Sequence, residues 1–93
     1  MARIIVTMIS VVLFLNLINA QQFKDIDDLR EKADSLHSIG QTEEAIKTGE
    51  EAIQLAEESG DPVEIVGTHA AQGVFLRSVG RIDQALESYD RAL

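Results

Sequence analysis

A segment that recurs after 40 residues without a gap is the feature that most constrains this chain. Residues 33–53 (ADSLHSIGQTEEAIKTGEEAI) align with residues 73–93 (GVFLRSVGRIDQALESYDRAL). The identical pairs are Leu36/Leu76, Ser38/Ser78, Gly40/Gly80, Ala45/Ala85 and Ala52/Ala92. A fixed period in this range is typical of proteins in which one supersecondary unit stacks on the next. We therefore predict two units, residues 26–61 and 62–93, with the second cut short relative to the first.

Within each unit the apolar residues recur at helical spacing, and a glycine follows each helical stretch. The predicted helices run from about Ile26 to Gly40, from Thr42 to Glu58, from Pro62 to Val79, and from Ile82 onward. We expect Asp25 or Asp27 to cap the first helix, after a polar lead-in over residues 21–25. Asp61, Pro62 and Glu64 form the pattern of a capping box before the third. No stretch alternates as a strand does, so the fold class is all-α.

Residues 1–20 (MARIIVTMISVVLFLNLINA) have the layout of a secretory signal peptide. Arg3 supplies a positive charge, Ile4 to Leu15 is an uncharged apolar run, and a small residue, Ala20, precedes the polar Gln21. The alternative interpretation is an uncleaved membrane anchor, for which the uncharged stretch lies at the short limit of a bilayer span. The chain is thus expected to be exported, and to be periplasmic, extracellular or membrane-anchored; contact with a membrane is expected only through residues 1–20.

The charge and the composition exclude several classes of function. The formal charge is −8, so the surface repels phosphate backbones and we expect no nucleic-acid binding. There is no cysteine, which excludes a disulfide framework and a thiol nucleophile. His37 and His69 fall on different predicted helices, and the usual explanation for each is a partly exposed surface histidine. We expect no catalytic residue, cofactor or metal, and hence no enzyme.

The repeat resembles the tetratricopeptide repeat (TPR) family, over roughly residues 26–93. The resemblance rests on small residues where paired helices touch, on bulkier residues beside them, and on turn glycines. These repeat-packing residues are Ala33, Leu36, Gly40, Ala45, Ala52, Gly73, Leu76, Gly80, Ala85, Tyr89 and Ala92. The period is longer than the usual 34 residues, which resembles the long-repeat subtype of bacterial regulators and sensors. Gly49 stands where the other copy has the large Tyr89, so looser packing is expected there.

The resemblance implies a superhelix whose concave surface, lined by the first helix of each pair, binds a protein or peptide. The groove-facing positions that carry over are Arg30, Asp34, His37, Val74, Arg77 and Ser78. Some TPR proteins clamp a terminal carboxylate with basic residues and asparagines. Because Asp34 and Val74 stand where those asparagines would be, a mixed groove with Arg30, Arg77 and Val74 is the expectation here.

Three functions compete on the sequence. An exported interaction scaffold fits the repeats and the lack of a catalytic constellation. An extracytoplasmic sensory region of a larger signalling protein, such as a sensor kinase or a transcriptional regulator, fits the long-repeat subtype, and further repeats C-terminal to Leu93 would accompany it. A small enzyme has the least support, because no acid–base pair is placed in a pocket.

Export predicts where the mature chain begins. Mass spectrometry of the product secreted by a bacterial host should find Gln21 at the amino terminus. A product that retains Met1 or Ala2 would contradict cleavage and favour the anchor.

Overall fold

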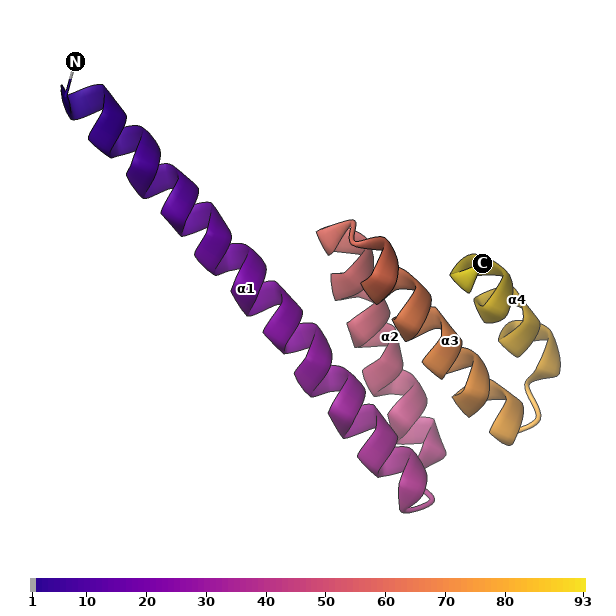
Figure 1. Ribbon diagram of the computed structural model, residues 1–93. Helices are drawn as coiled ribbons and strands as arrows, with labels where there is room; N and C mark the ends of the chain where they lie inside the picture. Colours follow the sequence, from indigo (N-terminus) through magenta and orange to yellow (C-terminus); the bar gives the residue numbers. More distant parts are fainter. Residues whose placement is uncertain (1) are drawn as a thin grey trace.

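The computed structural model describes residues 2–93, apart from the surroundings of side chains 2–8, 15, 16, 18 and 19. Its helices are α1 (Ala2–Ser38), α2 (Thr42–Ser59), α3 (Pro62–Ser78) and α4 (Ile82–Ala92). Each helix runs antiparallel to the one before it, which gives the pairs α1–α2 and α3–α4, with α3 packed on α2 (Figure 1). Residues 2–93 contain no strand, and the predicted all-α class is confirmed.

The predicted start of the first helix is wrong, because α1 continues without a break through residues 21–25. That stretch contains neither glycine nor proline, and the Gln21 Nε2 donates to Asp25 Oδ1 at 3.0 Å, one helical turn along. Asp25 and Asp27 therefore lie inside a helix and cap nothing. The part of α1 before the repeat projects beyond the other three helices (Figure 1). The predicted leader, residues 1–20, forms this projection except for Met1, which lies outside the described residues.

The turns after α1 and α3 are copies of one another. Gly40 and Gly80 have φ values of 86° and 82°, in the left-handed region that glycine enters at no steric cost. Gln41 N–H donates to Leu36 C=O at 2.8 Å, and Arg81 N–H donates to Leu76 C=O at 2.9 Å. Gly40 N–H also donates to His37 C=O at 3.1 Å, and Gly80 N–H donates to Arg77 C=O at 3.0 Å. Together these bonds form the Schellman pattern of helix termination. The predicted helix ends here are confirmed to within two residues.

The start of α3 confirms one half of the predicted capping box. Asp61 Oδ1 accepts from the N–H groups of Val63 at 2.9 Å and Glu64 at 3.2 Å, and Pro62 occupies the first turn. The reciprocal bond is not formed, because the Glu64 carboxylate turns toward Arg30 instead. The side-chain cap satisfies backbone donors that the helix itself leaves free.

The core lies where the helices approach most closely, and small residues make that approach possible. Of the predicted repeat-packing residues, Ala33, Ala45, Ala52, Gly73, Leu76 and Ala85 are buried, while Leu36, Tyr89 and Ala92 are half-buried. Ile46 and Phe75 join Ala33, Ala45, Leu76 and Ala85 in one cluster that spans both pairs, and Leu36 and Tyr89 pack against it. The two turn glycines are exposed, as their role in chain reversal requires.

The expected loose packing at Gly49 is wrong, because a side chain from the other repeat fills the space. Gln72 of α3 lies against Gly49, and its Nε2 donates to the Ile46 carbonyl at 3.0 Å. A cavity of about 10 Å³ remains beside it. In the second pair the ring of Tyr89 covers Gly73 directly, so the two copies fill equivalent spaces by different means.

The contact between Tyr89 and Gly73 makes a testable prediction. A Cβ atom on Gly73 would lie 2.6 Å from Tyr89 Cε1, so Gly73→Ala must displace the ring. Alanine ordinarily stabilises a helix interior by about 1 kcal/mol relative to glycine. Overpacking costs about 1–3 kcal/mol, and we expect a net loss of about 1 kcal/mol.

Urea unfolding followed by circular dichroism measures this difference. Gly67→Ala is the matched control in the same helix, because its nearest neighbour is the mobile end of Arg30, at 3.1 Å. Gly67→Ala should leave the stability unchanged or raise it slightly. A Gly73→Ala variant as stable as Gly67→Ala would contradict the close contact.

Candidate functional site

The candidate site is the face on which α1 and α3, the first helices of the two pairs, lie beside each other. We call it the A face. It consists of Arg30 and His37 of α1 and of the α3 residues that follow helical spacing along one side, Val63, Val66, Gly67, Ala70, Val74 and Arg77. The spacing keeps them in one stripe, and Gly67, which contacts Arg30, places that stripe toward α1.

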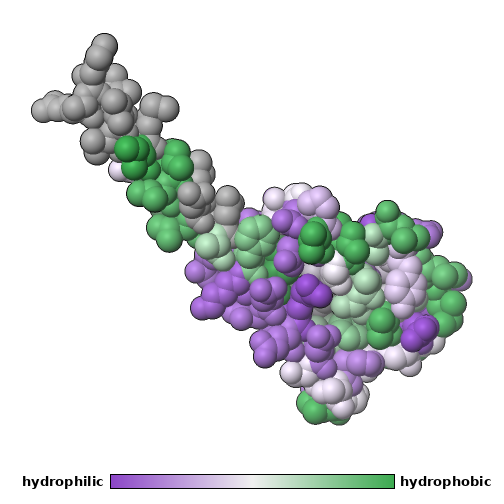
Figure 2. All heavy atoms as spheres, viewed as in Figure 1, coloured by the Kyte–Doolittle hydropathy of each residue, from purple (hydrophilic) through white to green (hydrophobic). Residues whose placement is uncertain are grey.

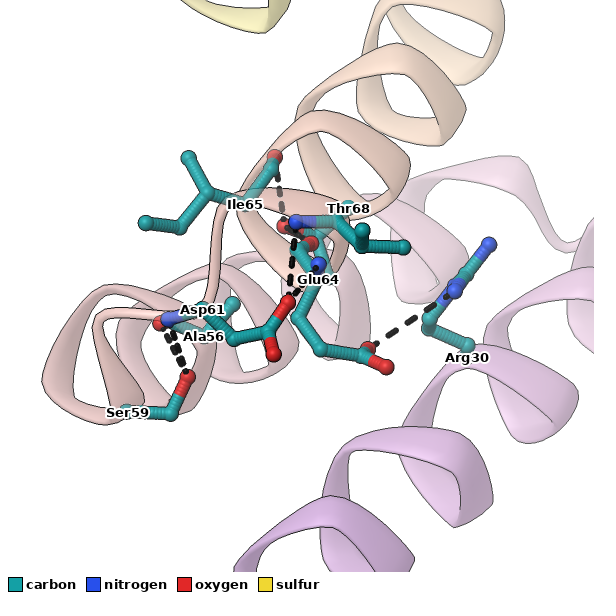
Figure 3. A network of polar contacts seen from close by, with 8 residues as sticks. Arg30, Ala56, Ser59, Asp61, Glu64, Ile65 and Thr68 are labelled. Carbon is teal, nitrogen blue, oxygen red and sulfur yellow. Dashed lines mark hydrogen bonds and ion pairs between the residues drawn. The ribbon is translucent and has the colours of Figure 1, made fainter.

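Arg30 ties the two helices together near the start of α3 (Figure 3). Its Nη1 lies 3.8 Å from Glu64 Oε2, and its guanidinium packs flat against α3 where Gly67 has no side chain. Glu64 Oε2 is buried and accepts no hydrogen bond from the described residues. The pair is therefore loose, and the Arg30 side chain, 38% exposed, keeps donors available for another acceptor.

A hollow opens beside Arg30. It has a volume of about 460 Å³ and is lined by Arg30, Pro62, Val63, Val66 and Gly67. Its walls are apolar apart from the guanidinium, and Val63 is 76% exposed. Such a surface can bind a ligand that places an apolar side chain in the hollow and a hydrogen-bond acceptor against the Arg30 guanidinium.

The loop before α3 fixes the position of this hollow (Figure 3). Ser59 Oγ donates to the Ala56 carbonyl at 2.6 Å and accepts from Asp61 N–H at 3.2 Å. In the second turn of α3, Thr68 Oγ1 donates to the Glu64 carbonyl at 2.8 Å. These bonds hold the loop and the first turns of α3, the part of the chain whose Pro62, Val63, Val66 and Gly67 line the hollow.

At the other end of the A face the helices meet through two rings. The centroids of His37 and Phe75 are 5.0 Å apart, and the planes are tilted by 46°. His37 Nδ1 lies 3.1 Å from Thr42 Oγ1, so this histidine is half-buried and held in place. Beyond it, Val74 and Arg77 are exposed.

The structure thus distributes the six groove residues predicted from the sequence. Arg30, Val74 and Arg77 present side chains on the A face, and Asp34 is an exposed residue at the edge of the small cavity beside Gly49. His37 serves the contact between helices. Ser78 is exposed, but its Oγ donates to the Phe75 carbonyl at 2.7 Å and closes the end of α3. Among the described residues, no acid lies within ion-pair distance of Arg77.

His69 corrects the expectation of a surface histidine. It is 3% exposed between α2 and α3, and its Nε2 lies 3.1 Å from Glu57 Oε1. The sequence did not predict this contact between His69 and Glu57. It also did not predict the packing of Gln72 against Gly49 or the ion pair between Arg81 and Glu43. The only available signal was the missing large side chain at Gly49, which indicates that some other group must fill the space.

Across the described part of the chain, no three histidine, aspartate or glutamate side chains gather as a metal site would require. Of the helices in that same part, none combines the length and the hydropathy needed to cross a bilayer.

Apolar side chains nevertheless gather on the projecting part of α1 and again over α3 and α4 (Figure 2). On α1 they are Ile9, Val11, Val12, Leu13, Phe14 and Leu17, all more than half exposed.

Comparison with family models, curated proteins and solved structures gives no match to this chain.

Proposed function

We propose that this chain is an exported TPR-type scaffold that binds a protein or peptide through the A face. The observation that carries the proposal is the exposed apolar stripe of α3, formed by Val63, Val66 and Val74, beside the hollow at Arg30. Apolar side chains that the fold leaves in water along one helix are available to a partner. Cations at Arg30 and Arg77 would orient an acidic or carbonyl-bearing segment along that stripe.

The contacts that hold α1 and α3 in place behind the A face support the same proposal. Capped ends, the ring contact of His37 with Phe75 and the buried packing of α3 on α2 leave few groups to be ordered on binding. A preformed surface loses less entropy on association than a flexible one does. Residues 1–20 would direct export, and the exposed apolar residues of α1 before residue 18 fit a segment that a membrane or a translocation channel receives.

A displayed library of random peptides, panned against the immobilised chain, tests the proposal. Selected peptides should bind with micromolar affinity, and calorimetry should show Val74→Asp weakening binding by about tenfold or more. Arg30→Gln should weaken binding several-fold, since it removes one charge-assisted contact.

Glu51→Gln is the matched control, because Glu51 is exposed on α2, away from the A face. It should leave the affinity unchanged. Selected peptides that bind the Val74→Asp and Arg30→Gln variants as tightly as the unmodified chain would contradict the proposed site.

A further inference from the structure

The Arg30 end of the A face carries more negative than positive charge. Of the described residues that line the hollow, only Arg30 is charged. Glu64 Oε2 lies 3.8 Å from its Nη1, too far for a hydrogen bond but near enough to offset much of its charge (Figure 3). Helical spacing places the exposed Asp27 and Asp34 one turn to either side of Arg30 on α1. Asp61 adds a fourth carboxylate where α3 begins, so this end is acidic apart from one guanidinium.

These acids restrict which acceptor Arg30 can bind. Its guanidinium lies flat on Gly67, so one face is covered while the N–H donors lie in the plane of the group. A peptide carbonyl can accept from those donors and brings no net charge. A carboxylate would accept as well, but Glu64 and the three aspartates repel it. The N-terminus of α3 does not compensate, because Asp61 Oδ1 already accepts from two of its N–H groups. This end therefore favours an uncharged carbonyl with a basic residue nearby.

The other end of the A face has the opposite charge. Arg77 is exposed, and among the described residues no acid lies within ion-pair distance of its guanidinium. A guanidinium of this kind can hold a carboxylate through paired hydrogen bonds. Val74, less than one turn before Arg77, is 40% exposed and continues the apolar stripe between the two ends. The A face is therefore acidic at one end, apolar along its length and basic at the other end.

We infer that the A face binds a peptide segment in which the charges follow a fixed order. An apolar side chain of the segment enters the hollow, and the adjacent backbone carbonyl accepts from Arg30. A basic residue beside that apolar one faces the acids at this end, and an acidic residue farther along pairs with Arg77. This inference rests on the proposed function and adds the chemistry of the partner, which is a dipolar segment and not a uniformly acidic one.

The two ends also set the spacing between the apolar and the acidic residue of the segment. Arg77 follows Val66, which lines the hollow, by eleven positions of the same helix. Eleven positions correspond to about 16 Å along the helix axis. An extended peptide advances about 3.3 Å per residue, so about five residues span this distance. The acidic residue is therefore expected about five positions beyond the apolar one, with the basic residue on the opposite side of it.

Two displayed peptide libraries, panned against the full chain, test the order of charges. In the first, lysine precedes a fixed leucine, glutamate stands about five positions beyond the leucine, and every other position is a random uncharged residue. The second library exchanges the lysine and the glutamate, so composition and net charge are the same. By calorimetry, the best clones of the first library should bind about tenfold or more tightly than those of the second.

Reversing the charge of Arg77 gives a second comparison with clones of the first library. Arg77→Glu should weaken their binding about tenfold or more, and changing the glutamate of a clone to lysine should restore its affinity for that variant. Lys47→Glu is the matched control, because Lys47 is exposed on α2 and the charge changes by the same amount. It should leave the affinity unchanged. Arg77 is exposed, so circular dichroism should show the variant folded as the unmodified chain is.

The outcomes separate this inference from the proposed function. Clones of both libraries that bind equally well, and that Val74→Asp weakens, would leave the A face as a binding site and overturn the order of charges alone. Tighter binding by the second library, or clones that Arg77→Glu leaves unaffected, would overturn it in the same way. A selection that yields no binder, or binders that Val74→Asp does not weaken, would overturn the proposed function and this inference with it.

Discussion

The close approach of paired helices at positions without large side chains is the constraint on which the rest of the structure depends. Tyr89 can lie on α3 only because Gly73 has no Cβ, and Gln72 can reach the Ile46 carbonyl only because Gly49 has none. These contacts bring the buried alanines of α2 and α4 against the neighbouring helices. Interiors packed at this density tolerate little change of volume, so both glycines fix the distance between helices as well as their own local packing.

Polar contacts set how the second pair sits on the first. Arg81 reaches Glu43 at the turn end, His69 reaches Glu57 toward the other end, and Arg30 meets Glu64 on the A face. The Arg81 and Arg30 contacts join partly exposed groups and contribute at most about 1 kcal/mol each. Their value lies in register, since each requires one particular placement of the second pair on the first. Apolar burial therefore supplies most of the stability, while these pairs select one arrangement.

Much of the fold could be predicted from the sequence, and the failures have physical causes. The glycines at 40 and 80 and the Asp61 cap are local signals, so the bounds of α2, α3 and α4 were close to those observed. The continuity of α1 was missed because residues 21–25 look like a polar linker, although nothing in them interrupts a helix. The burial of His69 and the insertion of Gln72 depend on contacts between repeats, which a periodic pattern within one repeat does not report. The A face could be placed from the resemblance, but the hollow beside Arg30 could not, because it depends on the orientation of the loop before α3.

The stacked pairs leave the A face of α3 exposed, and this face places apolar side chains beside charge. The A face depends on this stacking, which nuclear Overhauser effects in the labelled chain measure most directly. The stacking predicts effects between the Tyr89 ring and the Gly73 Hα protons, and between the Gln72 side-chain amide and the Gly49 Hα protons. A Tyr89 ring and a Gln72 amide that show neither, or strand-type effects anywhere in residues 26–93, would contradict the stacked helix pairs and leave the A face without a basis.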